Sequence, residues 1–158
     1  MSKIEIPQAA ADRCKVWIKA ITETLEKNVD KQTAEKTMRA AGKSCAEQLL
    51  SKTIDHFGRR PESVAELVEA INKRRRECLD TENYWRLEEK KAFFKLDRCG
   101  CDLVESCLAD PGPTFCQCSA GMFENLFKPF CTGEVHTEIV KAIGMGNDCC
   151  EFIVHFEE

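Results

Sequence analysis

The sequence lacks any apolar run near the roughly 20 residues that a membrane-spanning helix needs, so we expect no membrane span. Its start, MSKIEIPQAAADRCKVW, has neither an apolar core nor a cleavage pattern, which argues against a signal peptide. Positive charge is not in excess: the formal net charge of −4 argues against nucleic acid as a partner. The chain holds only three histidines, and this limits where a histidine could act as a base or a metal ligand.

Cysteine, in contrast, is abundant, with eleven among 158 residues. In a small secreted protein such a count would predict a disulfide framework. This chain is longer and rich in lysine and glutamate, and we expect no export signal. We therefore expect a cytoplasmic protein whose thiols are free, buried or bound to metal.

The first half of the chain is predicted to be helical, because apolar residues recur there at helical spacing in two stripes. Between the stripes, Asp30 is expected to cap a second helix, and Gly42 to end or bend it before a third. Gly58 and Pro61 mark a turn. The two stripes are Cys14, Trp17, Ile18, Ile21 and Leu25, and Val64, Leu67, Val68 and Ile71.

The second half has strand character, with one more helix inside it. Residues 85–99, WRLEEKKAFFKLDRC, favour an extended structure. Ser119 is expected to cap a helix that Pro129 and Gly133 end. EVHTEIVKAI and CEFIVHF then predict two strands around the turn GMGND, and the last strand alternates apolar and polar residues, so one sheet face should be buried.

These elements predict a single α+β domain over residues 1–158, with a helical part at about 7–80 and a strand-rich, cysteine-rich part at about 84–156. We expect the N-terminal helices to pack on a small, twisted antiparallel sheet that includes a C-terminal β-hairpin.

The C-terminal sequence CQCSAGMFENLFKPFCTGEVHTEIVKAIGMGNDCCEFIVHF resembles the end of the 4-vinyl reductase-like small-molecule-binding domains. The same pattern occurs in relatives of aminothiazoline-carboxylate hydrolase, and it is similar to a cysteine-rich bacterial family of unknown function. The resemblance covers about residues 90 to 156. The matching positions are Gly121, Gly133, Val135, Gly146, Asp148, Cys150 and Phe152.

This resemblance implies a helical layer on a twisted antiparallel sheet, a fold related to ligand-binding domains of sensors and to vesicle-tethering subunits. It also implies an apolar pocket between helices and sheet, a small apolar or thiol-reactive ligand, and pairing into a homodimer. Fold likeness alone does not assign an activity.

Two C-x-C pairs, Cys99 with Cys101 and Cys116 with Cys118, predict a zinc site. Four thiolates form a closed tetrahedral site for zinc. Gly100 would permit the local bend that chelation by neighbouring strand residues needs. Cys45, from the helical half, is a candidate to replace one of the four ligands.

The same cysteines are candidates for a nucleophile. Cys116 and Cys118 precede the helix that Ser119 is expected to cap, and a helix N-terminus stabilises a thiolate. A nucleophile also needs a base, for which His136 is the candidate. This interpretation predicts a cysteine-dependent hydrolase similar to the aminothiazoline-carboxylate enzymes.

A third interpretation is that the cysteines simply pack as small hydrophobic residues. Taken together, the residues and the resemblance favour a cytosolic bacterial protein that binds a small molecule or metal through a cysteine-rich, zinc-holding site beside an apolar pocket. The alternatives are the hydrolase and a non-catalytic interaction protein without metal.

Overall fold

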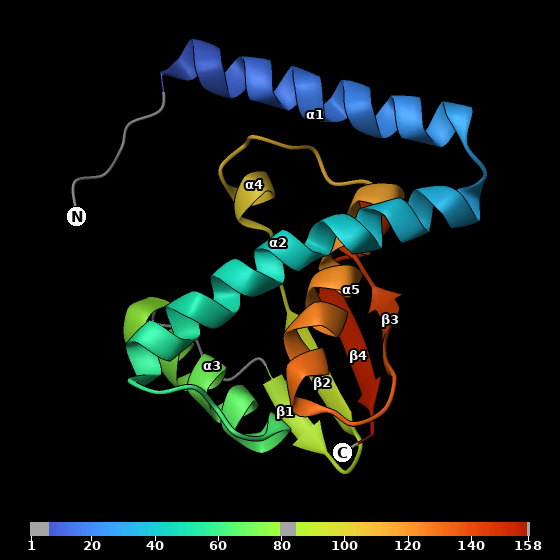
Figure 1. Ribbon diagram of the computed structural model, residues 1–158. Helices are drawn as coiled ribbons and strands as arrows, with labels where there is room; N and C mark the ends of the chain where they lie inside the picture. The colour runs from blue at the N-terminus through green and yellow to red at the C-terminus, as the bar shows by residue number, and fades with distance from the viewer. Residues whose placement is uncertain (1–6, 80–84, 158) are drawn as a thin grey trace.

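The computed structural model describes residues 7–79 and 85–157. Three helices come first, and a four-stranded sheet with two further helices follows (Figure 1). The helices are α1 (Gln8–Asn28), α2 (Lys31–Phe57), α3 (Val64–Leu79), α4 (Asp102–Glu105) and α5 (Pro113–Phe127). The strands are β1 (Trp85–Glu88), β2 (Lys91–Leu96), β3 (Val135–Lys141) and β4 (Cys150–Phe156).

The sheet has the strand order β1-β2-β4-β3, and each neighbouring pair is antiparallel. Helix α5 lies along one face of the sheet, and α2 crosses over α5 on the side away from the strands (Figure 1). The α+β prediction, with helices packed on a small antiparallel sheet that ends in C-terminal strands, is confirmed.

The alternation in the last strand is confirmed as well. Cys150, Phe152, Val154 and Phe156 are buried, whereas the residues between them are only partly buried. The predicted extended stretch before α4 forms β1 and β2 around a tight turn, in which Glu89 takes a positive φ of 46°. This hairpin places Trp85 opposite Phe94.

Helix α3 carries the second apolar stripe into the core. Val64, Leu67, Val68 and Ile71 are all buried, as the helical spacing predicts. The core continues into an aromatic cluster between α5 and the sheet, whose ring centroids lie 4.9 to 5.8 Å apart. Its members are Trp85, Phe94, Phe123 and Phe152.

Gly42 does not end or bend a helix, so that prediction was wrong: α2 continues through it to Phe57. Instead, Gly42 and Gly121 allow α2 and α5 to cross in backbone contact. A Cβ on Gly42 would lie 2.8 Å from the carbonyl carbon of Gly121, and a Cβ on Gly121 would lie 2.5 Å from that of Arg39. Asp30 does cap α2, because its side chain accepts a hydrogen bond from the backbone N–H of Thr33.

The prediction that Ser119 caps a helix was also wrong. Helix α5 begins six residues earlier, at Pro113, with Gly112 as the N-cap. Proline suits the first turn of a helix because its missing N–H has no partner there in any case. Cys116 and Cys118 are therefore inside α5, on different sides of the helix, and do not precede it.

Helix α1 forms as predicted, but its apolar stripe lies at the surface. No residue of α1 is buried, and Trp17 is 65% exposed. Lys15 forms a 2.8 Å ion pair with Asp110, which ties α1 to the segment between α4 and α5. Within residues 7–79 and 85–157, no helix is both long and apolar enough to cross a membrane.

Candidate functional site

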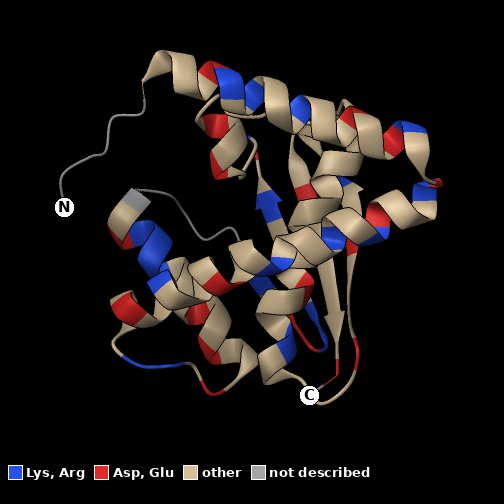
Figure 2. Cartoon of the chain, turned by 45° about the horizontal axis from the view of Figure 1, so that its top comes forward, with Lys and Arg blue, Asp and Glu red and all other residues tan. Residues whose placement is uncertain are grey.

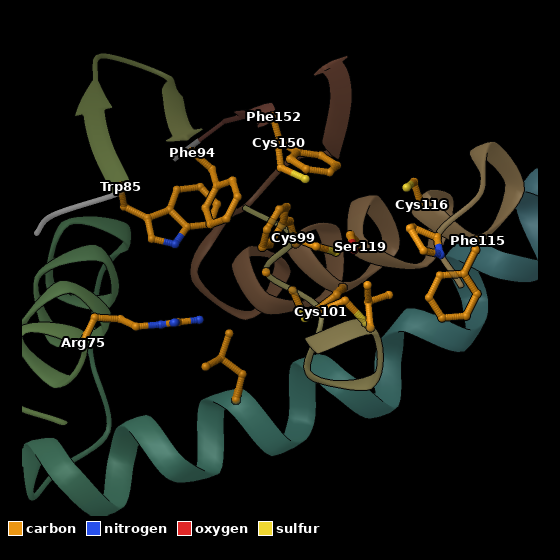
Figure 3. A pocket seen from close by; sticks show the side chains of 16 residues that line it. Arg75, Trp85, Phe94, Cys99, Cys101, Phe115, Cys116, Ser119, Cys150 and Phe152 are labelled. Atoms are coloured by element: carbon orange, nitrogen blue, oxygen red, sulfur yellow. The ribbon is translucent and has the colours of Figure 1, made fainter. Parts of the chain in front are cut away.

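A small cavity lies where α3, α4 and α5 meet the sheet (Figure 3). Its volume is about 40 Å³, which exceeds the roughly 10 to 15 Å³ that one water molecule needs. Most of the lining is apolar. Five aromatic side chains contribute to it: Trp85, Phe94, Phe115, Phe123 and Phe152.

The segment that joins β2 to α5 covers this cavity from outside. Val104 in α4 and Pro111 after it both line the cavity. Helix α4 has only four residues, and Leu103 on its surface is 39% exposed. No residue of α4 is buried, which favours local opening of this cover over opening of the buried helices and strands of the wall.

Among the residues that the structure describes, one cationic side chain reaches the cavity. Arg75 in α3 lines it, and its guanidinium group points toward the space between α3 and the cysteines (Figure 3). A guanidinium group pairs readily with a carboxylate through two parallel hydrogen bonds. The cavity therefore combines an apolar wall with one group that is suited to an acid.

Cys99 and Cys150 form one thiol pair at the cavity. Cys99 donates a hydrogen bond to the sulfur of Cys150, and this contact lowers the pKa of Cys150. The backbone at Ile143 and Gly100 lowers the pKa of Cys150 further. The same contact raises the pKa of Cys99, because Cys99 must keep its proton to donate it.

Cys45 and Cys118 form a second thiol pair, between α2 and α5. Cys118 donates a hydrogen bond to the sulfur of Cys45, which lowers the pKa of Cys45 to about 6. Cys118 is partly buried, and its pKa is raised. Cys45 is exposed, so its sulfur is the more accessible of the two.

The predicted zinc ligands are thus near one another but divided between two pairs. Cys99, Cys101 and Cys116 line the cavity, whereas Cys118 faces α2. Burial raises the pKa of both Cys101 and Cys116, which favours neutral thiols there. Among the residues that the structure describes, no group of three or more cysteine, histidine or acidic side chains is arranged to hold a metal ion. Zinc binding stays a prediction.

The candidates for a hydrolase are not assembled as a nucleophile and its base. His136 lies on β3, where its Nδ1 is 3.7 Å from Glu124 Oε1 and its ring stacks on His155. Cys118 is paired with Cys45. The structure therefore does not bring His136 to Cys116 or Cys118, all of which it describes.

The sequence interpretation did not identify two residues, Cys150 and Arg75, as part of the site. Cys150 fits the apolar face of its strand, so packing was the natural interpretation, yet it meets Cys99 across the sheet end. Arg75 belongs to the run KRRRE at the end of a helix, which is typical of a solvated surface. A cation one turn after the buried Ile71, on the same helix, is the signal that could have identified it.

The fold is shared with a subunit of a trafficking protein particle complex. Sixteen chains of solved structures match. One is described as a trafficking protein particle complex subunit 3 from Naegleria fowleri covalently bound to palmitic acid. The likeness has a TM-score of 0.60 at 13% identity and covers 94% of this chain and 95% of that one. At this identity the likeness shows the fold alone, and no curated protein matches the chain.

The chain belongs to a family of unknown function, DUF6144, whose model matches residues 4–157. This agrees with the expectation of an uncharacterised family. The solved structure described above is a trafficking subunit, not the 4-vinyl reductase-like domain that the C-terminal sequence suggested. Among the matching positions, Gly121 lies inside α5, Gly146 lies in the turn before β4, and the Cys-x-Phe lies in β4. Residues in such places do not distinguish related folds.

Proposed function

We propose that the protein binds an apolar small molecule with an acidic group in the cavity between α3, α4, α5 and the sheet. The observation that carries this proposal is the composition of the cavity wall: aromatic rings and thiols on most sides, and the Arg75 guanidinium on one. Ligand sites commonly combine an apolar wall with a few polar groups that orient the ligand.

A ligand has to enlarge this cavity. Its volume of about 40 Å³ is far below the roughly 300 to 1,000 Å³ of common ligand sites. We infer that the segment with α4 moves outward when the ligand enters, because it is short and partly exposed. Burial of the ligand's apolar surface would then offset the loss of the contacts that Val104 and Pro111 make.

The fold supports a ligand of the fatty-acid class. The trafficking subunit with the same fold is described as covalently bound to palmitic acid, and an acyl chain with a carboxylate matches an apolar wall with one arginine. If the ligand is also reactive toward thiols, Cys150 is the thiol to which it would attach, because its pKa is lowered and it lines the cavity.

Two further expectations remain proposals. Zinc bound by Cys99, Cys101, Cys116 and Cys118 would require those side chains to move together, and elemental analysis of untagged protein tests it. A homodimer is supported by the exposed apolar side chains of α1, since a surface of this kind often marks an interface.

The proposal predicts that filling the cavity abolishes binding. Ser119 lines the cavity from α5, so Ser119→Leu should leave no space for a ligand. Isothermal titration calorimetry with decanoate should show saturable binding, at one site per chain, to the native protein. Binding should be lost in Ser119→Leu and kept in Ser44→Leu, the same change at an exposed position of α2. Equal decanoate binding by both variants would refute the assignment to this cavity.

A second arm of this titration tests the role of Arg75. Arg75→Gln removes the charge but keeps a polar side chain of similar length. Decanoate should bind this variant about tenfold more weakly, since a charge-assisted hydrogen bond contributes on the order of 1.5 kcal/mol. Decanol, which has no carboxylate, should bind both proteins alike.

A further inference from the structure

The last turns of α2 and α3 bring together a cysteine, a histidine and a glutamate outside the cavity. Cys78 and Glu77 are neighbours on α3, and His56 lies in the last turn of α2. The Cys78 sulfur is 3.7 Å from Nδ1 of His56, and Nε2 of His56 is 2.7 Å from Oε2 of Glu77.

This arrangement has the geometry of an activated thiol. One ring nitrogen of His56 faces the thiol, and the other is held by the carboxylate of Glu77, so the imidazole is oriented toward Cys78. A nucleophile, a base and a group that orients the base recur wherever a side chain is activated in this way. Contacts of this kind are often longer before a substrate binds.

Several cationic side chains surround the cluster, although Arg59 is paired with Glu66. Lys73, Arg74 and Arg76 precede Glu77 on α3, whereas Arg75 between them lines the cavity, and Figure 2 shows blue segments along the last turns of that helix. Lys73 Nζ lies 6.0 Å from the ring centroid of Phe57, next to His56, and the guanidinium carbon of Arg59 lies 5.3 Å from the same centroid. Reactive cysteines are typical of exposed, electropositive surroundings.

One effect opposes activation. Cys78 sits at the C-terminal end of α3, where the helix dipole disfavours a negative charge by roughly 0.3 to 1 kcal/mol. The Cys78 sulfur and the His56 ring are nevertheless in direct contact, at 3.7 Å, so His56 is placed to take the proton of the thiol.

We propose that Cys78 is a reactive thiol that forms a mixed disulfide with small anionic disulfides, with His56 as its base and Glu77 as the residue that positions His56. His56 takes the proton of Cys78, and the thiolate attacks one sulfur of the disulfide. A new sulfur–sulfur bond forms as the old one breaks. The displaced thiolate leaves with the proton from His56, so no further oxidant is needed.

The contacts among Cys78, His56 and Glu77 contribute little to the stability of the folded protein. Cys78 and Glu77 are exposed and His56 is partly buried, and exposed ion pairs contribute about 0 to 1 kcal/mol. Replacement of His56 or of Glu77 should thus change the reactivity of Cys78 and leave the melting temperature almost unchanged. This separates activation from a merely structural contact.

The test is the rate at which each cysteine reacts with oxidised glutathione at pH 6.5, followed by mass spectrometry of peptides. Cys14, which is exposed on α1, is the control within the same protein. Cys78 should react at least about fivefold faster than Cys14. His56→Gln should bring Cys78 to the rate of Cys14. Glu77→Gln should slow it partly, and Glu77→Asp should restore part of the loss.

A charge comparison identifies the class of disulfide. Cystamine is a cationic disulfide and oxidised glutathione an anionic one. Cys78 should prefer glutathione, the preference should fall as salt screens the basic residues, and Lys73→Gln should reduce it further. The proposal is overturned if Cys78 reacts no faster than Cys14, if His56→Gln leaves its rate unchanged, or if cystamine reacts as fast as glutathione.

Discussion

Replacing Gly121 by alanine should lower the melting temperature of the protein by about 10 °C. The added Cβ would meet the backbone of Arg39 and would lie 2.5 Å from its carbonyl carbon. Backbone atoms cannot rotate away as a side chain can, so α2 and α5 have to separate. Forced overpacking of this kind costs about 3 kcal/mol, and in a protein of this size each kcal/mol corresponds to roughly 2 to 4 °C.

Helix propensity opposes this loss, because alanine in a helix is favoured over glycine by at most about 1 kcal/mol. The clash is the larger effect. Gly112→Ala is the matched control, since a Cβ there meets nothing within 4 Å, and it should change the melting temperature by only a few degrees. Thermal unfolding followed by circular dichroism measures both. A Gly121→Ala protein as stable as the native one would contradict the close crossing of α2 and α5.

Cys45 should react with a small neutral disulfide about tenfold faster at pH 6 than it does in a Cys118→Ala variant. The hydrogen bond from Cys118 lowers the pKa of Cys45 to about 6, so half of Cys45 is thiolate at that pH. Without the donor the pKa should rise toward the ordinary value of about 8.5. The thiolate fraction then falls by about two orders of magnitude, and the greater basicity of the sulfur recovers roughly one of them.

The sign of the pH dependence follows from the same shift. In the native protein the rate at Cys45 should level off above pH 6, whereas in Cys118→Ala it should keep rising toward pH 8 and beyond. Cys14 on α1 is the control and should behave alike in both proteins. Mass spectrometry of peptides after quenching gives the rate at each site. A native profile with its midpoint near pH 8.5 would show that Cys118 does not stabilise the Cys45 thiolate.

Much of the fold could be predicted because its signals are local. Helical spacing at Val64 to Ile71 and alternation at Cys150 to Phe156 each follow from one element with one buried face. The role of Gly42 was predicted wrongly because the close contact that requires a glycine there is with Gly121, 79 residues further along the chain. Ser119 was wrongly predicted to be an N-cap because a serine before an apolar run often starts a helix. Proline also occurs in the first turn of helices, and Pro113 starts α5 before Ser119 is reached.

The site was harder to predict because its contacts join distant elements. C-x-C spacing directs attention to Cys99 with Cys101 and to Cys116 with Cys118. Inside a helix, residues two apart point to different sides, so Cys118 turns toward α2. Its partner, Cys45, was foreseen only as a substitute ligand. Nothing in the spacing of His56 and Cys78 shows that the ends of α2 and α3 meet.

The central claim is that an apolar ligand occupies the cavity beside Trp85, and tryptophan fluorescence can test this directly. The chain has two tryptophans: Trp85 lines the cavity and is 3% exposed, whereas Trp17 is on the surface of α1. In Trp17→Phe the emission comes from Trp85 alone. A decanoate with bromine on its chain quenches a tryptophan that it touches.

Titration of Trp17→Phe with brominated decanoate should quench Trp85 in a saturable way, with one ligand per chain, and Ser119→Leu in the same background should abolish the quenching. The reciprocal variant Trp85→Phe, in which only Trp17 emits, should show no saturable quenching. Trp85 emission that stays constant at ligand concentrations that saturate the protein by calorimetry would contradict the account, because the ligand would then bind away from the cavity.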